Sequence, residues 1–298
     1  MKSFLLAGLL LCFGCSSEPE PVLDSGETGV SDPVEDACAP DGLPSGQAVG
    51  EADCSEGICS ISAGPFWRGQ SSEGEADADA CPLHVVELDA FRIDQQETSM
   101  GDYNDCVDAG VCSQRDGECN SIYSNWKGDP DLLPVVCVTH SQAQTYCEWR
   151  GGRLPTEAEW EKAARGEEGA TFPWGQRAPL CEDGNFRFVS WYCQQSVVEV
   201  GSYPETTTAF GLLDTLGNAW EWTADYYDAT WYQVAPRTNP MSPETCAIDP
   251  LQSKGDCTHR VIRGGGFNAT EQNTRASARS LSEPDRADVN LGFRCAYD

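Results

Sequence analysis

A short acidic turn at residues 214–221 carries the most concrete chemistry in this sequence. It reads Asp-Thr-Leu-Gly-Asn-Ala-Trp-Glu, with the carboxylates of Asp214 and Glu221 at its two ends. Hard cations such as Ca²⁺ take oxygen ligands, and a tight turn that combines carboxylates with backbone carbonyls supplies several of them within a few residues. The alternative is that Trp220 is core and Glu221 is solvated surface. We expect the core role for the tryptophan and the metal for the carboxylates.

Other arrangements that could do chemistry are poorly supported. The three histidines, His84, His140 and His259, are scattered, and no C-x-x-C pair occurs in the mature chain, so a structural zinc site is not expected. The serines lack the context of a nucleophile elbow, and no stretch resembles a phosphate-binding loop. The sequence therefore predicts neither a zinc protein nor a Ser-His-Asp hydrolase.

The amino terminus predicts export. Residues 1–15 begin with Met-Lys, continue with an apolar run too short to span a bilayer, and end at Gly14-Cys15, as in a bacterial lipoprotein signal peptide with Cys15 as the lipidated residue. An ordinary secretory signal cleaved nearby is the alternative. Residues 16–53 are acidic and poor in large apolar side chains, which predicts a flexible linker. We expect a protein of the bacterial cell envelope, lipid-anchored to the membrane and facing the periplasm or the cell surface.

Cysteine usage agrees with an oxidising compartment. The chain has 16 cysteines, and removing Cys12 with the signal and Cys15 as the lipid carrier leaves 16 − 2 = 14, an even number. Sequence alone does not fix the pairing. Short spacings suggest four local disulfides: Cys54 with Cys59, Cys106 with Cys112, Cys181 with Cys193, and Cys246 with Cys257.

The charge excludes some partners. The formal net charge is −29, from 48 acidic and 19 basic residues, and it would repel nucleic acid and anionic membrane surfaces. We expect no nucleic-acid partner and membrane contact only through the lipid anchor. The acidity is best interpreted as a solubility device, although it also favours cationic ligands and metal ions.

Few regular elements are predicted, joined by long connections. Thr156 with Glu159 and Thr139 with Gln142 are capping boxes that should open two short amphipathic helices, and Ser99 should open a third. Residues 85–93 and 260–262 read as strands. The 29 glycines and 18 prolines predict that irregular connections carry much of the chain.

Several ordered phrases resemble one known family. They are GGRLPTEAEWEKAARG from Gly151, GLLDTLGNAWEWTADYY from Gly211, RVIRGGGF from Arg260, and NLGFRC ending at Cys295. Together they resemble the formylglycine-generating-enzyme (sulfatase-modifying factor) family. The resemblance implies an α+β, elaborated C-type-lectin-like domain over residues 54–298, rich in loops and stapled by disulfides. It also implies a disulfide between Cys147 and Cys295.

The resemblance implies calcium sites. In the family the first would use the Asp214 and Glu221 side chains with the carbonyls of Gly217 and Ala219. A second would begin at the Asn185 side chain and the Phe186 carbonyl. No aspartate stands at the expected place downstream, so the second site is in doubt. A bridge between Cys181 and Cys193 could serve the same structural purpose.

The residues for the family's oxygen chemistry are absent. Family members that make formylglycine bind copper(I) through two cysteines after the RGG phrase, since soft thiolates suit that ion. Here the first position falls on Ala269 and the second lies within residues 271–274. No cysteine occurs between Cys257 and Cys295. We therefore expect no copper and no formylglycine generation.

The same segment is expected to line a groove. Residues 266–281 would offer amide and guanidinium groups that recognise peptides, sugars or carboxylates: Asn268, Gln272, Asn273, Arg275 and Arg279. For Arg279 a buried pair with Asp285 or Asp288 is an equally good interpretation. The favoured function is a calcium-stabilised module that binds an unknown peptide, protein or glycan. The alternative is a metal-dependent oxidoreductase of the same family that uses a different metal site.

Overall fold

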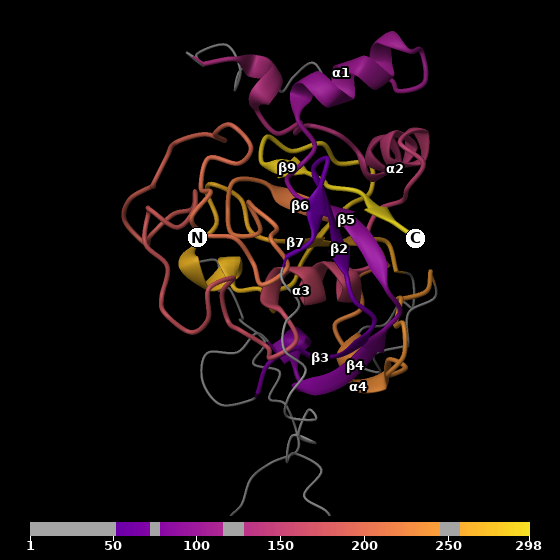
Figure 1. The fold of residues 1–298 in the computed structure, drawn as a ribbon, viewed down its shortest axis with the longest axis vertical. Helices are drawn as coiled ribbons and strands as arrows, with labels where there is room; N and C mark the ends of the chain where they lie inside the picture. The colour runs from indigo at the N-terminus through magenta and orange to yellow at the C-terminus, as the bar shows by residue number, and fades with distance from the viewer. Residues whose placement is uncertain (1–51, 72–77, 116–127, 245–256) are drawn as a thin grey trace, which may run out of the picture.

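A computed structural model describes residues 52–71, 78–115, 128–244 and 257–298 (Figure 1). It has the expected α+β architecture, with short elements joined by long ordered connections. Helices α1 and α2 lie at one end of the molecule, strands β3 and β4 with helix α4 lie at the other, and α3 lies between them (Figure 1). The predicted signal peptide with Cys15, and the predicted linker up to residue 51, fall outside the described residues.

Three small sheets form the strand framework. The first has the order β1-β2-β5-β10, the second pairs β3 with β4, and the third has the order β8-β7-β6-β9. All pairings are antiparallel except that of β6 with β9. The bounds are β1 Cys54–Ser55, β2 Ile58–Ile61, β3 Gly64–Arg68, β4 His84–Leu88, β5 Phe91–Asp94, β6 Trp220–Tyr226, β7 Arg260–Arg263, β8 Ser280–Ser282, β9 Leu291–Gly292 and β10 Ala296–Tyr297.

The predicted helices begin at the predicted caps. Ser99 caps α1, Thr139 caps α2 and Thr156 caps α3, and the last two form complete capping boxes with Gln142 and Glu159. The bounds are α1 Met100–Asp108, α2 His140–Trp149, α3 Glu157–Arg165 and α4 Trp231–Val234. Three short 3-10 turns are η1 Ala78–Ala80, η3 Pro130–Leu132 and η4 Glu271–Thr274.

Helix α3 is buried on every side despite its charged sequence. Glu157 and Glu161 are fully buried, and guanidinium groups from three other parts of the chain pair with them: Arg68, Arg263 and Arg279. Buried charges are tolerated when they are paired and hydrogen-bonded. This ion-pair set, which we call the α3 network, joins β3, β7 and the segment after η4 to one central helix.

Four predicted disulfides are confirmed: Cys54–Cys59, Cys106–Cys112, Cys181–Cys193 and Cys147–Cys295. Cys246, the predicted partner of Cys257, lies outside the described residues. A disulfide-rich domain of this kind is consistent with an extracytoplasmic location. Within the described residues no helix is long and apolar enough to cross a bilayer.

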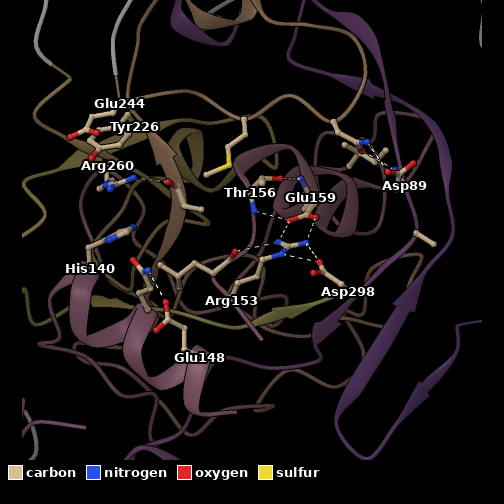
Figure 2. A pocket seen from close by; sticks show the side chains of 17 residues that line it. Asp89, His140, Glu148, Arg153, Thr156, Glu159, Tyr226, Glu244, Arg260 and Asp298 are labelled. Carbon is tan, nitrogen blue, oxygen red and sulfur yellow. Dashed lines mark hydrogen bonds and ion pairs between the residues drawn. The ribbon is translucent and has the colours of Figure 1, made fainter. Parts of the chain in front are cut away.

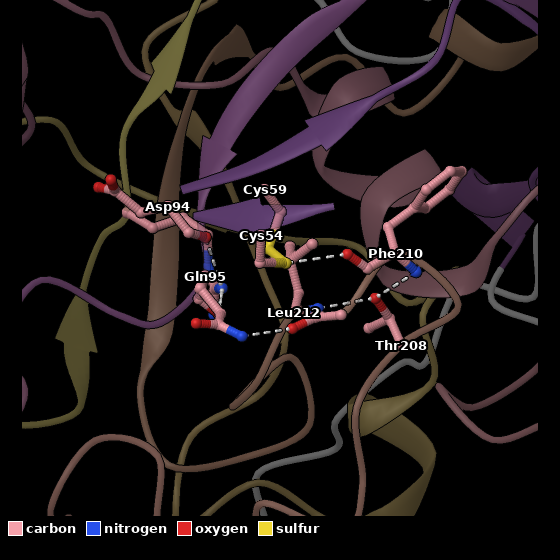
Figure 3. The surroundings of a disulfide bond; sticks show 9 residues. Cys54, Cys59, Asp94, Gln95, Thr208, Phe210 and Leu212 are labelled. Carbon is pink, nitrogen blue, oxygen red and sulfur yellow. Dashed lines mark hydrogen bonds between the residues drawn. A yellow bond between two sulfur atoms is a disulfide. The ribbon is translucent and has the colours of Figure 1, made fainter. Parts of the chain in front are cut away.

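The Cys54–Cys59 bridge lies beside the connection that leads into the acidic turn (Figure 3). The Gln95 side-chain amide donates to the Gly211 carbonyl at 3.0 Å, and the Thr208 hydroxyl accepts from the backbone N–H groups of Phe210 and Leu212. The backbone N–H of Leu213 donates to the Gln95 carbonyl. Strand β5 and its sheet therefore fix the chain just before Asp214.

Candidate functional site

Residues 214–221 form a tight turn, as predicted. Asp214, Gly217 and Asn218 all have positive φ, at 57°, 78° and 62°. A Cβ at Gly217 would lie 2.1 Å from the Asn185 carbonyl oxygen, so only glycine permits this approach. The Asn218 N–H donates to that carbonyl at 2.7 Å. The two segments predicted to bind calcium are thus in contact with one another.

Three buried carboxylates share one guanidinium beside this turn. Glu221 accepts from Arg294 through both oxygens, each at 2.7 Å, and Oε2 also accepts from Trp160 Nε1. Glu97 accepts from the Asn218 side-chain amide at 2.6 Å and from the Ala219 N–H at 2.9 Å. Asp214 accepts from the Gly201 N–H at 2.6 Å through Oδ2. We call Glu97, Asp214, Glu221 and Arg294 the acidic cluster.

The excess of acid shifts the ionisation of the acidic cluster. Burial, and to a lesser extent the charge of Glu221, raises the pKa of Asp214 to about 6. Burial followed by the charges of Asp214 and Glu221 raises the pKa of Glu97 well above its usual value. One positive charge cannot neutralise three carboxylates, so the ionised cluster favours an added cation or added protons.

The donors present fit a hard cation in part. Asp214 Oδ1 is buried and has no hydrogen-bond partner in the described part of the chain. A buried carboxylate oxygen without a partner is a suitable cation ligand. Both oxygens of Glu221 are already engaged. No group of three or more His, Cys, Asp or Glu side chains in the described ranges is arranged to hold a metal. The predicted calcium site is not a group of that kind, because it combines only two carboxylates with the backbone carbonyls of Gly217 and Ala219.

The second predicted site is held by hydrogen bonds. The Asn185 amide donates to the Ser196 carbonyl at 2.9 Å and to Asn218 Oδ1, and the Phe186 carbonyl accepts from the Cys193 N–H. Asn185 Oδ1 is buried without a partner among the described residues. The Cys181–Cys193 disulfide closes the same loop. Calcium here stays a prediction, and the disulfide is present in the place where it was expected to substitute for the ion.

The position of the first expected thiol is part of the core. Ala269 is 6% exposed and packs in the cluster that contains Trp220 and Leu291. Residues 271–274, which hold the second position, form the turn η4. The nearest flanking cysteines, Cys257 and Cys295, are both disulfide-bonded.

Most predicted groove residues lie on the surface beside Ala269. Asn268, Gln272 and Asn273 are exposed and Arg275 is half-buried. The Asn290 side-chain amide donates to Asn268 Oδ1 at 2.7 Å, which adds a further amide to this surface. We call residues 268, 272, 273, 275 and 290 the amide face.

The prediction that Arg279 lines a groove is wrong, whereas the alternative of a buried ion pair is correct in kind. Arg279 does not face a groove, because its side chain is fully buried and donates to both oxygens of Glu157, at 2.6 and 3.1 Å. The proposed partners were also wrong, since Asp288 pairs with Arg286 on the surface. Glu157 attracts Arg279 because a carboxylate buried in α3 requires several cations around it.

Sequence reasoning missed a hairpin beside the amide face. Residues 186–193 fold back on themselves, with Phe188 N–H donating to the Trp191 carbonyl, and Val189 and Trp191 are 88% and 52% exposed. Arg187 anchors the hairpin by donating from its backbone to the Ala269 carbonyl and from Nε to the Asn268 carbonyl at 3.1 Å. The sequence signal that could have revealed this hairpin is the spacing of Phe186, Phe188 and Cys193, because alternate residues of a strand lie on the same face. These three side chains pack in one hydrophobic cluster.

Comparison with protein families matches residues 46–298 to the "Sulfatase-modifying factor enzyme 1-like domain". The chain belongs to this family. The match covers every residue that the structure describes, including Cys147, Cys295 and the turn at residues 214–221.

The curated relatives include formylglycine-generating enzymes and hercynine oxygenases. The formylglycine-generating enzyme of Thermomonospora curvata is 38% identical over 181 residues, 55% of each chain. That of Mus musculus is 34% identical and covers 80% of this chain and 74% of its own. The hercynine oxygenase of Mycolicibacterium thermoresistibile is 29% identical and covers 73% of this chain and 53% of its own. The chain spans about half the length of the first bacterial relatives that it matches.

Solved structures agree on the fold. PvdO from Pseudomonas aeruginosa superposes with a TM-score of 0.66 at 25% identity and covers 81% of this chain and 94% of its own. Treponema denticola variable protein 1 superposes with a TM-score of 0.57 at 18% identity, covers 80% of this chain and 94% of its own, and supports the fold alone.

Proposed function

We propose that this sulfatase-modifying-factor domain is an exported, lipid-anchored recognition module that binds a peptide, protein or glycan and does not generate formylglycine. The observation that carries the proposal is the position of Ala269. Its methyl group is packed in the core where the family resemblance expects the first copper-binding thiol. A methyl group has no lone pair to offer a metal, so that position cannot bind copper(I).

The surface next to Ala269 supports recognition. The amide face presents four neutral side-chain amides and the guanidinium group of Arg275, and the hairpin at residues 186–193 adds exposed aromatic and aliphatic area beside it. Binding surfaces commonly combine rigid aromatic anchors with adaptable polar contacts. The Cys181–Cys193 disulfide and the Arg187 contacts hold the hairpin in place, so less ordering entropy is lost on binding.

Calcium enters the proposal as a structural ion. Asp214, with the carbonyls of Gly217 and Ala219, would hold it, and Glu221 would contribute from its position beside Arg294. When bound, the ion supplies positive charge to an acidic cluster that has three carboxylates and one guanidinium. The ion would stabilise the turn at residues 214–221, which contacts the segment that contains Asn185.

Two measurements on the purified chain test the proposal. Elemental analysis should find calcium and no stoichiometric copper or iron. A peptide bearing a sulfatase cysteine motif, incubated with oxygen and a reductant, should give no aldehyde, whereas the Mus musculus formylglycine-generating enzyme gives the positive control. Aldehyde formation would overturn the interpretation of Ala269. Stoichiometric iron or copper with oxygen consumption would favour the alternative, an oxidoreductase of the same family with a different metal site.

A further inference from the structure

A cavity of about 700 Å³ lies away from the amide face, among helix α2, strand β6 and the last residue of the chain (Figure 2). Drug-sized ligands occupy cavities of this size. Its walls come from the β4–β5 turn, from α2, from the segment that opens α3, from β6, and from residues 239–244. The sulfatase-modifying-factor resemblance assigns no function to it.

The walls are apolar and the rim is charged. Leu88, Ala90, Leu154, Ala224 and Met241 supply the apolar lining. Two guanidinium groups also line the cavity, those of Arg153 and Arg260, together with five carboxylates: Asp89, Glu148, Glu159, Glu244 and Asp298. The lining side chains therefore carry 5 − 2 = 3 excess negative charges. Nothing else that lines it is charged, because His140 is buried and its pKa is lowered to about 4, with desolvation as the main cause.

Both arginines are occupied by protein groups. Arg153 donates to both oxygens of Glu159 at 2.7 Å and to Asp298 Oδ1 at 2.8 Å, so two carboxylates already surround this cation (Figure 2). Arg260 lies flat against the Tyr226 ring, 3.5 Å from its centre, and donates to the Ala224 carbonyl. Arg153 is therefore neutralised by carboxylates, whereas Arg260 forms no ion pair within the described residues and its buried Nε has no hydrogen-bond partner there.

Within the described residues, three exposed acids of the cavity form no ion pair: Asp89, Glu148 and Glu244. Glu148 accepts a hydrogen bond from the neutral Gln144 amide, and Asp89 accepts one from the neutral Asn239 amide. Asp298 is shared with Arg153 but its side chain is 88% exposed. Glu148 lies on one side of the view in Figure 2, and Asp298 and Asp89 lie on the other. A ligand that enters therefore meets apolar walls and a negatively charged rim.

We infer that this cavity binds a primary ammonium group carried on an apolar body. Such a group is found on small aralkyl or alkyl amines and on the lysine side chain of a peptide. The apolar part would contact Leu154, Ala224 and Met241, and the ammonium group would lie at the charged edge of the cavity, beside Glu148 on one side or beside Asp298 and Asp89 on the other. A carboxylate on the same body would meet three excess negative charges.

Three congeners with one body and different charge test the inference: 4-phenylbutylamine, 4-phenylbutanol and 4-phenylbutyrate. Isothermal titration with the full chain at low salt should give the tightest binding for the amine, and no measurable binding for the carboxylate. Raising the salt concentration should weaken only the amine. Equal or tighter binding of 4-phenylbutyrate, or no binding of any congener, would overturn the inference.

Three variants locate the binding. Glu148→Gln and Asp298→Asn should each weaken amine binding by about two- to five-fold, because an exposed charge pair contributes roughly 0.2–1 kcal/mol. Ala90→Trp, on the exposed rim, should fill the entrance and abolish it. Glu182→Gln and Asp108→Asn are matched controls on exposed acids that do not line the cavity, and they should change nothing. Amine binding that survives Ala90→Trp would place the site elsewhere and end the inference.

A separate experiment distinguishes a lysine side chain from a free amine as the source of the ammonium group. Acetyl-Ala-Lys-Ala-amide that binds more tightly than 4-phenylbutylamine assigns the cavity to lysine side chains, and weaker binding assigns it to free amines. Acetyl-Ala-Glu-Ala-amide is the charge control and should not bind.

Discussion

The two buried charge networks of this protein differ in their balance of acids and guanidinium groups. In the α3 network, Glu157 and Glu161 are surrounded by Arg68, Arg263 and Arg279, and Arg165 also pairs with Glu161. In the acidic cluster, Glu97, Asp214 and Glu221 share only Arg294. Both are buried, so the difference lies in the number of charges and not in exposure.

That difference reverses the direction of the pKa shifts. Burial opposes ionisation of Glu161, but Arg263, Arg165 and Arg68 outweigh it and lower the pKa of Glu161 to about 2. The pKa of Glu157 is lowered in the same way, with Arg279 as the strongest cation. In the acidic cluster burial prevails and the pKa of Asp214 rises to about 6. The α3 network therefore keeps its two carboxylates ionised, whereas the acidic cluster favours a cation or protons.

The largest expected effect comes from breaking the α3 network. Glu157→Gln keeps the shape of the side chain and leaves Arg68, Arg263 and Arg279 short of one buried negative charge. We expect a loss of about 3–5 kcal/mol in the free energy of unfolding, measured by urea denaturation with the disulfides intact. Glu148→Gln, the same change on the exposed face of α2, is the control and should have almost no effect. A loss below about 1 kcal/mol would show that the network is not the framework we describe.

Removing calcium should affect only the acidic cluster. If calcium occupies the turn at a free concentration 100-fold above its Kd, chelation should cost about 2.7 kcal/mol and lower the Tm. Asp214→Ala should make the protein insensitive to the chelator, while Asp183→Ala, which removes an acid paired with Arg177 outside the acidic cluster, should leave the sensitivity intact. An unchanged Tm in the presence of a calcium chelator would remove calcium from the proposed function.

Local sequence determined what could be predicted here. The capping boxes at Thr139 and Thr156 and three of the disulfides involve residues that are at most 12 positions apart, so spacing alone indicates them. The Cys147–Cys295 pair, separated by 148 positions, was found only through the family resemblance. The acidic turn was predicted both from the short spacing of Asp214 and Glu221 and from the family resemblance.

Long-range charge pairing could not be predicted in this way. Arg279 is 122 positions from Glu157, and no spacing rule connects a loop arginine to a helix that is buried on all sides. Glu97 was likewise missed as a member of the acidic cluster, because its contact with Ala219 spans 122 positions. The cavity of Figure 2 draws its walls from residues between 88 and 298, so it exists only in the folded chain.

A pH dependence should appear in the calcium-free protein. The folded-state pKa of Asp214, about 6, is above its unfolded value of 3.8, so the folded state binds the proton more tightly and stability falls as pH rises from about 4 to 6. The contribution of Asp214 at pH 5 should exceed that at pH 7 by about 1 kcal/mol. Asp225, whose pKa burial also raises to about 6, adds a similar slope in every variant. The slope lost in Asp214→Asn, measured by urea denaturation at pH 5 and 7, therefore reports Asp214 together with its effect on the pKa of Glu97, and an unchanged slope contradicts the assignment of Asp214.

The smallest expected effect provides the surface reference for both networks. Arg286 pairs with Asp288 at 2.6 Å, a distance as short as those inside the α3 network, yet their side chains are 60% and 38% exposed. Solvent and salt screen such a pair, so Arg286→Ala should leave the free energy of unfolding almost unchanged. Urea denaturation in low and high salt measures this directly. A cost comparable to that of Glu157→Gln would mean that short distance, and not burial with its balance of charges, determines the strength of ion pairs in this fold.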